Sequence, residues 1–207
     1  MKVSSVSNRR KQLTAVTLED GSQLMLDTEL TVIKGIAPGV IIDDPDTLLY
    51  ESELKRAKSR AMWYLSRGDH SENGLYDKLI AAGFPDDVCN EATERMKELG
   101  LINDEAYARR LAEYLSASGA SDRDIYIKLI HKGIDSDMAK FTIEDLPDDD
   151  EVEKILNLLK TKFAGKLENW NDLQKTIAAL QRKGFTYADV RAALRRYNEE
   201  IEDEEEE

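Results

Sequence analysis

The spacing of apolar residues changes near Asp44. Before it, strand-forming residues come in two short runs, Leu13–Leu18 and Gln23–Asp27, and between them stands the Asp20-Gly21 pair of a tight hairpin turn. After it, apolar residues recur every three or four positions, which is the spacing of amphipathic helices. The pattern predicts a small β-hairpin, a short irregular stretch over 28–42 with one helical turn, and then a long helical segment.

Nine helices in three sets of three are expected after this point. In the first set, a helix over 45–66 has Asp44 as its cap and Pro45 at its first position, Ser71 caps the second helix, and Pro85 opens the third. In the second set, the cap residues are Asn103, Ser121 and Ser136. The third set spans about 148–163, 171–183 and 186–198, and Thr186 with Asp189 resembles a capping box.

One short step is repeated at a spacing of about fifty residues. It reads Gly83-Phe84, then Gly133-Ile134, then Gly184-Phe185, each after a capped helix. Glycine adopts the left-handed conformation that ends a helix, and the large residue after it folds back into the core of its own unit. Three independent helix ends would explain each pair separately, but the regular spacing favours a stack of equivalent units with an extended binding surface.

These patterns predict a mainly α-helical protein of three tandem three-helix repeats, elongated or curved, with an N-terminal hairpin and an acidic, disordered C-terminal tail. Leu79 and Leu129 are expected to be equivalent buried positions of the first two repeats. The expected segments are a hairpin extension at 1–44, repeats at 45–100, 101–146 and 147–198, and a tail at 199–207.

Charge and composition narrow the class of protein. The net charge is −13, but eight of the negative charges lie in the last nine residues, and the remaining body carries −5. The sequence shows no apolar run of membrane-spanning length and no apolar signal segment. A single cysteine, Cys89, fits a reducing compartment. We therefore expect a monomeric, cytoplasmic protein that does not enter a membrane.

No set of residues has the spacing of a catalytic or metal centre. The chain lacks a Gly-rich phosphate loop and a His/Cys cluster. His70 and His131 are expected on the surface near helix ends, and Cys89 as a small buried residue. The acidic runs, such as 148–151, fit solvated helix starts. We expect no enzyme activity and no cofactor.

Basic residues form two concentrations along the chain. One lies on the first long helix, and the other covers residues 160–196, which carry a net charge of +6. A solvated charged face explains such a segment, and a surface for a polyanion or an acidic protein groove explains it equally well. The basic residues show no interleaved aromatic residues of the kind that stack single-stranded bases.

Several of these segments resemble the bacterial RecX family, regulators of the RecA recombinase. The resemblance rests on the three tandem units, on Ser71 to Phe84, on the run Leu99-Gly100-Leu101-Ile102-Asn103-Asp104-Glu105-Ala106-Tyr107-Ala108-Arg109, and on Gly119, Ile125, Leu129 and Gly133-Ile134. It covers residues 12 to about 197 and is most specific in the middle of the chain. Arg123 matches a frequent basic position of the family, and Arg109 and Arg110 stand nearby.

The resemblance implies a non-catalytic regulator that binds the RecA–DNA filament and damps its ATPase, coprotease and strand-exchange activities. A helical module that binds single- or double-stranded DNA without RecA is the alternative, and a scaffold for an unrelated partner is a third. The candidate contact residues for the partner or for DNA are Lys58, Arg60, Arg67, Arg109, Arg110, Arg123, Lys128, Lys132, Lys175, Arg182, Lys183, Arg191 and Arg195.

Overall fold

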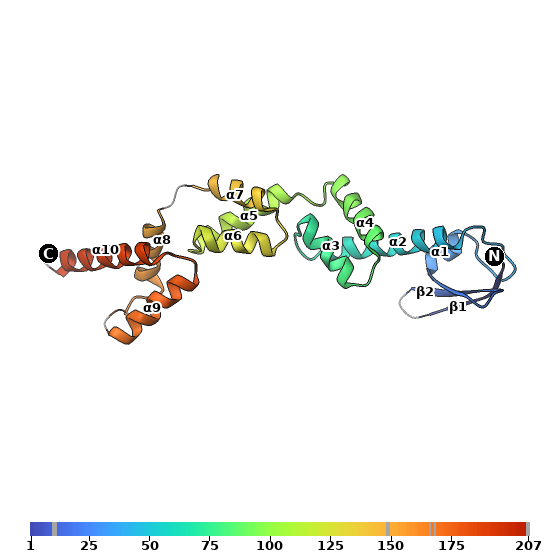
Figure 1. Cartoon of the computed structure of the whole chain (residues 1–207), viewed down its shortest axis with the longest axis horizontal. Helices are drawn as coiled ribbons and strands as arrows, with labels where there is room; N and C mark the ends of the chain where they lie inside the picture. The colour runs from blue at the N-terminus through green and yellow to red at the C-terminus, as the bar shows by residue number, and fades with distance from the viewer. Residues whose placement is uncertain (10–11, 148–149, 166, 168, 206–207) are drawn as a thin grey trace. The chain divides into compact units, whose positions relative to one another are not determined.

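The structure is a computed structural model that describes residues 1–9, 12–147, 150–165, 167 and 169–205; of 202–205 it describes the backbone. The chain divides into two compact units, Met1–Asn103 and Asp104–Glu207 (Figure 1). Unit 1 contains β1 (Val3–Asn8), β2 (Leu13–Leu18), β3 (Gln23–Asp27), α1 (Thr28–Ile33), α2 (Pro45–Leu65), α3 (Glu72–Ala81) and α4 (Asp86–Glu98). Unit 2 contains α5 (Asp104–Ala117), α6 (Asp122–His131), α7 (Ser136–Glu144), α8 (Glu151–Thr161), α9 (Trp170–Arg182) and α10 (Tyr187–Glu205).

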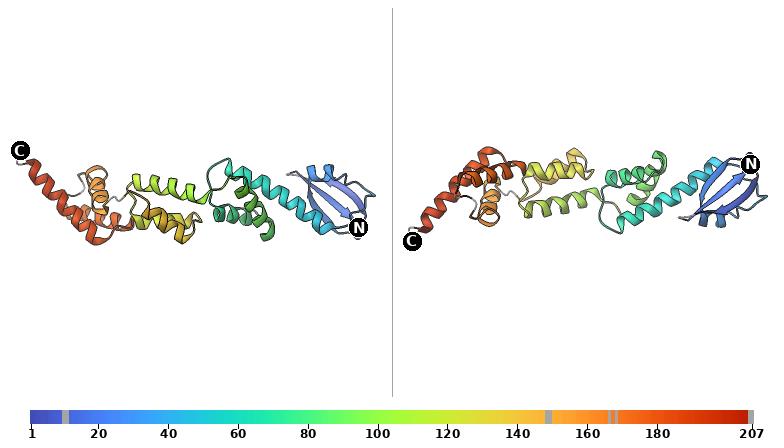
Figure 2. Two further views of the ribbon diagram at one scale, coloured as in Figure 1. Left: turned by 90° about the horizontal axis from the view of Figure 1, so that it is seen from above. Right: turned by 90° about the horizontal axis from the view of Figure 1, so that it is seen from below.

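The N-terminal element is a three-stranded antiparallel sheet in the order β1-β2-β3 (Figure 2). The predicted hairpin is present as β2 and β3, with the bounds expected from the sequence. The strand β1 was not predicted; it pairs with β2 and buries Val3 to 2% exposure. The helical turn expected within 28–42 is present as the short helix α1, which together with the nine helices after Asp44 makes ten described helices.

The sheet packs on the start of α2. Val16 and Leu26, both fully buried, contact a cluster that includes Leu48 of α2. The backbone N–H of Asp27 donates a hydrogen bond to Ser52 Oγ at 2.6 Å, and Ser52 is fully buried at this contact between β3 and α2. The sheet thereby gains the partner that a small isolated hairpin would lack.

The helices α2, α3 and α4 share one core. Ala57 and Ala61 of α2 are fully buried and let α4 approach closely, while Leu75 and Leu79 of α3 fill the space beside them. The predicted burial of Leu79 is confirmed. α3 ends where Gly83 adopts φ +90°, and the Phe84 N–H donates back to the Leu79 carbonyl at 3.3 Å. This is the chain reversal that glycine permits at a helix end.

Unit 2 has two further three-helix cores. One joins α5, α6 and α7 around Ile125 and Leu129, both fully buried, which confirms the prediction for Leu129. The other joins α8, α9 and α10 around Ile155 and Leu180. In these cores the repeated glycine step recurs: Gly133 has φ +83° and Gly184 has φ +93°. Ile134 and Phe185, the residues that follow, are each 3% exposed, as the repeat predicts.

A polar junction joins these two cores within unit 2. Ser121, the cap of α6, donates a hydrogen bond through Oγ to the Lys183 carbonyl at 2.7 Å. Nearby, Lys154 of α8 is 8% exposed and pairs with Asp122 at 3.0 Å and with Glu151 at 3.4 Å. Burial alone would lower the pKa of Lys154, but these two carboxylates raise it overall, so the ammonium stays charged.

The caps Asp44, Ser71 and Ser121 are confirmed by their side-chain hydrogen bonds to backbone N–H groups. Three boundaries differ from expectation. Asp135 caps α7, so Ser136 is its first helical residue, and Asn169 caps α9. The predicted acidic tail from 199 begins inside α10, which continues to Glu205, and residues 206–207 lie outside the described part of the chain.

Candidate functional site

Carboxylates neutralise a large share of the basic residues that the sequence singled out. Lys58 pairs with Glu91 at 3.2 Å, and Lys128 with Asp124 at 2.9 Å. The remaining pairs are Arg109 with Glu105 and Asp145, Lys175 with Asp172, Lys160 with Glu200, and Arg196 with Glu153. A basic side chain held by a carboxylate contributes less to binding an external anion, because the two charges cancel locally.

A second group of candidate residues has no carboxylate partner among the described residues. Its members are Arg60, Arg67, Arg123, Lys183, Arg191 and Arg195. Arg182 donates from Nε to the Ala178 carbonyl at 3.3 Å. Arg110 and Lys132 have interaction partners of their own. Lys166, also counted in the basic segment, lies outside the described residues.

Two of these arginines belong to a cluster at the C-terminal end of α2, with Arg60 on the helix and Arg67 in the turn that follows it. The guanidinium carbon of Arg60 lies 4.5 Å from the centre of the Trp63 ring, and that of Arg67 lies 4.1 Å from it. Arg56, one turn earlier, lies 5.6 Å from the centre of the Phe84 ring. We call Arg56, Arg60, Trp63, Arg67 and Phe84 the Arg–Trp cluster. The expectation that aromatic residues are absent from the basic surfaces was wrong.

The helix itself brings this cluster together. Arg60 precedes Trp63 by three positions on α2, and side chains at this spacing share one helix face. Arg67 lies in the turn after the helix, where its backbone N–H donates to the Tyr64 carbonyl at 3.0 Å. Trp63 is 41% exposed, so the indole lies on the surface and not in the core. The spacing was visible in the sequence, but the contact with Phe84 depends on the packing of α3 and α4 on α2.

A cleft of about 520 Å³ opens beside the cluster. It is lined by Gln12, Asp27, Arg56, Ser59, Arg60, Trp63, Ala82 and Phe84. The one carboxylate among these residues is already engaged, because Asp27 pairs with Lys55 at 2.7 Å. Burial alone would raise the pKa of Asp27, but hydrogen bonds from Lys55 and from the Leu30 N–H lower it overall. Arg56 and Arg60 therefore keep their positive charge available in the cleft.

The basic residues of unit 2 form a separate surface. Arg123 follows Ser121 at the start of α6, and this turn packs on the end of α9, where Lys183 and Gly184 lie. The structure thus brings Arg123 and Lys183, which are sixty positions apart in the sequence, to the same junction. Arg191 and Arg195 are exposed and lie one turn apart on α10.

The other candidate groups have local structural roles. Cys89 is buried, and burial raises the pKa of its thiol. His70 makes an edge-on contact with the Tyr64 ring, and His131 is the exposed last residue of α6. Tyr50 donates to Glu91 at 2.6 Å, and this hydrogen bond raises the pKa of Tyr50 to about 12.

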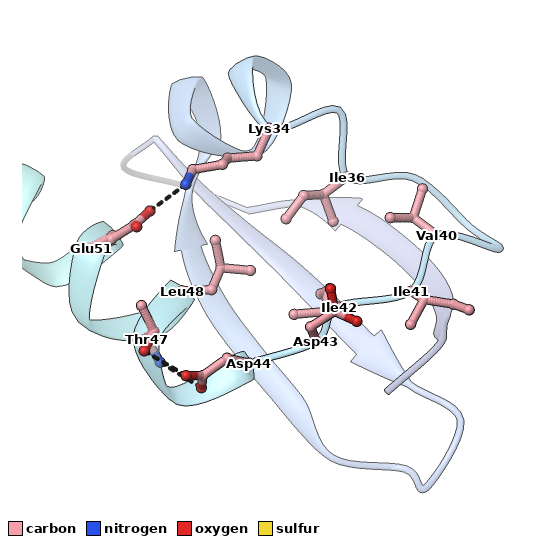
Figure 3. A pocket seen from close by; sticks show the side chains of 10 residues that line it. All are labelled: Lys34, Ile36, Val40, Ile41, Ile42, Asp43, Asp44, Thr47, Leu48 and Glu51. Carbon is pink, nitrogen blue, oxygen red and sulfur yellow. Dashed lines mark hydrogen bonds and ion pairs between the residues drawn. The ribbon is translucent and has the colours of Figure 1, made fainter.

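A smaller pocket of about 290 Å³ lies between the segment 34–44 and the start of α2 (Figure 3). Aliphatic side chains such as Ile36, Val40 and Ile42 form half of its lining and polar side chains the other half, including an ion pair between Lys34 and Glu51 at 2.7 Å. Within the part of the chain that the structure describes, no cluster of His, Cys, Asp and Glu could hold a metal ion. A search of the same residues finds no helix suited by length and hydropathy to cross a membrane.

Comparison with known proteins finds similarity to RecX proteins. Residues 57–96 match the first three-helix domain of RecX, and residues 148–194 match its third three-helix domain. The "Regulatory protein RecX" of Caldanaerobacter subterraneus subsp. tengcongensis is 29% identical over 198 residues, which is 94% of this chain and 98% of the relative. That of Clostridium perfringens strain SM101 is 28% identical and covers 94% and 95%.

Two solved structures share the fold. One, described as the crystal structure of regulatory protein RecX, superposes with a TM-score of 0.59 at 19% identity and covers 91% of this chain and 96% of that chain. The other is RecX from Lactobacillus salivarius, with a TM-score of 0.58 at 24% identity, covering 70% and 97%. The fold of this chain therefore also occurs in solved structures of RecX proteins.

Proposed function

Because the chain belongs to the RecX family, we propose that it is a non-catalytic, cytoplasmic regulator that binds the RecA–DNA filament and lowers its ATPase, coprotease and strand-exchange activities. The observation that carries the proposal is similarity over nearly the whole chain to proteins named regulatory protein RecX, at 94% coverage of this chain in the first relative. The proposal therefore rests on similarity along nearly the whole chain, and not on one shared helix.

The charges of unit 2 support a surface for this contact. Arg191 and Arg195 stand one turn apart on an exposed face of α10 with no carboxylate partner among the described residues. Guanidinium groups bind phosphates and carboxylates through two parallel hydrogen bonds, and a filament of protein on DNA offers both. We propose that this face, together with Arg123 and Lys183 at the junction, contacts the filament.

Sedimentation of preformed filaments tests the proposal. RecA is assembled on single-stranded DNA with a slowly hydrolysed nucleotide, this protein is added, and the fraction that sediments is measured across a salt series. We expect sedimentation above that on naked DNA. The double variant Arg191→Gln, Arg195→Gln should lower the bound fraction, because it removes two unneutralised charges.

A matched control removes the same amount of charge from paired residues. Lys140→Gln with Lys175→Gln takes two positive charges from unit 2, but both lysines are held by Asp137 and Asp172. The control should bind as the wild type does. Equal sedimentation with filaments and with naked DNA at every salt concentration would contradict a RecA-dependent role and would favour independent DNA binding.

A further inference from the structure

The three arginines of the Arg–Trp cluster are held by aromatic rings and not by carboxylates. Arg60 and Arg67 approach the Trp63 ring at 4.5 and 4.1 Å, and Arg56 approaches Phe84 at 5.6 Å. A ring engages the face of a guanidinium group, whereas the N–H donors lie along its edge. These side chains are thus oriented while their hydrogen-bond donors and their charge stay available.

The rest of α2 shows the opposite arrangement. Lys55 pairs with Asp27 and with Glu29, each at 2.7 Å, and Lys58 pairs with Glu91 at 3.2 Å. The same helix therefore has one basic face neutralised by its own unit and another face left unneutralised. Of the basic residues named here, Arg56 and Arg60 line the cleft, so the free charge and the hollow occur together.

The cleft combines the two chemistries that a nucleotide chain requires. Trp63 and Phe84 offer aromatic surface, and Arg56 and Arg60, in the same lining, offer hydrogen-bond donors for phosphates. Ser59 adds a hydroxyl group to the lining. Unpaired bases stack on aromatic rings and on guanidinium planes, while their phosphates bind the arginine edges. Bases in a duplex are stacked on each other and cannot reach such rings.

We propose that the Arg–Trp cluster of unit 1 is a binding site for single-stranded nucleic acid. Phosphodiesters bind Arg56, Arg60 and Arg67, and at least one unpaired base stacks on the surface formed by Trp63 and its arginines. This site works without RecA, so it is independent of the filament regulation proposed above. It distinguishes single strands from duplexes through the stacking step and not through charge.

The two tryptophans of the chain allow a direct test. Trp170→Phe leaves Trp63 as the only tryptophan in the full-length protein, so its emission reports on the cluster alone. This variant is titrated with an oligothymidylate of about 16 nucleotides, within the range of known single-strand sites, and with a duplex of the same length. We expect saturable quenching of Trp63 by the single strand and about tenfold weaker binding of the duplex.

Substitutions then separate this site from general attraction by charge. Arg60→Gln with Arg67→Gln should weaken binding of a dye-labelled oligothymidylate about tenfold, measured by anisotropy of the dye. The matched control is Lys34→Gln with Arg95→Gln, which removes the same charge from unit 1 at residues paired with Glu51 and Glu98. The control should bind as the wild type does, and circular dichroism confirms that each variant is folded.

Three results would overturn the proposal. The first is unchanged Trp63 emission at saturating oligothymidylate, and the second is equal loss of affinity in the Arg60/Arg67 variant and in its control. The third is an Arg60/Arg67 variant that binds oligothymidylate as the wild type does but no longer binds DNA-free RecA. That result would make the cluster a contact for an acidic protein surface. None of these results depends on whether the protein inhibits RecA, so the two proposals fail separately.

Discussion

The change Gly184→Ala tests the junction between the second and third three-helix cores. Gly184 has φ +93°, in the left-handed region that disfavours residues with a Cβ atom. An alanine Cβ at this position would overlap Ser121 Oγ and lie 3.3 Å from the Asp124 backbone nitrogen. Because Ser121 is 1% exposed and caps α6, its side chain cannot move aside without losing hydrogen bonds.

The expected loss of stability has two parts. Placing alanine at this backbone conformation costs about 1 kcal/mol. Displacing Ser121 removes its bond to the Lys183 carbonyl or its cap of the Asp124 N–H, which costs a further ~1–2 kcal/mol. We therefore expect Gly184→Ala to lower the free energy of unfolding by about 2–3 kcal/mol, with the second part arising only from the junction.

Urea unfolding followed by circular dichroism measures this loss, and Gly165→Ala is the matched control. Gly165 also has a positive φ, +73°, and lies between α8 and α9, but a Cβ there meets nothing within 4 Å. The control should lose only the backbone part, about 1 kcal/mol. In a Ser121→Ala background, Gly184→Ala should cost no more than the control, because the overlapping hydroxyl is gone.

Equal losses for Gly184→Ala and Gly165→Ala would refute the reasoning. So would a loss for Gly184→Ala that stays the same whether residue 121 is serine or alanine. Either result would mean that the end of α9 does not pack on the cap of α6 as the structure has it.

Four further outcomes are expected for the two units. Leu129→Ala should lower the free energy of unfolding by roughly 2–5 kcal/mol, since Leu129 is fully buried. Gly133→Ala should lower it by about 1 kcal/mol, and an unchanged melting temperature would count against its positive φ. The pKa of Asp27 lies below its usual 3.8, so the stability that the Asp27–Lys55 pair contributes is complete above pH 3.8 and is lost as the pH falls below it. In urea titrations at decreasing pH, the variant Asp27→Asn should not show this loss of stability. Cys89 should react with a thiol reagent slowly in the native protein and rapidly in urea, because burial raises its pKa and shields it.

The sequence alone predicted those elements that depend on residues close together in the chain, such as turns and helix caps. The Asp20-Gly21 turn set the hairpin, with Gly21 at φ +88°. Asp44 and Ser71 marked helix starts because a cap depends on one side chain and the nearest N–H groups. The left-handed glycines followed for the same reason, and so did the burial of Ile134 and Phe185, whereas Phe84 is only half-buried.

The features that sequence reasoning missed depend on distant contacts. β1 has serine at half of its positions and gives a weak strand signal, and its stability comes from pairing with β2, from hydrogen bonds to residues 39 and 40, and from the burial of Val3. Whether a carboxylate neutralises a given basic side chain depends on residues far along the chain, as Glu91 does for Lys58. The contact between Arg56 and the Phe84 ring likewise forms only when α2, α3 and α4 pack into their common core.

The rate of ATP hydrolysis by RecA on single-stranded DNA, measured with and without this protein, tests the central proposal most directly. The account predicts that the rate falls as the full-length protein is added. It also predicts that Arg191→Gln with Arg195→Gln weakens this inhibition while Lys140→Gln with Lys175→Gln does not. A rate unchanged by folded protein, at concentrations where it sediments with the filament, would contradict the account.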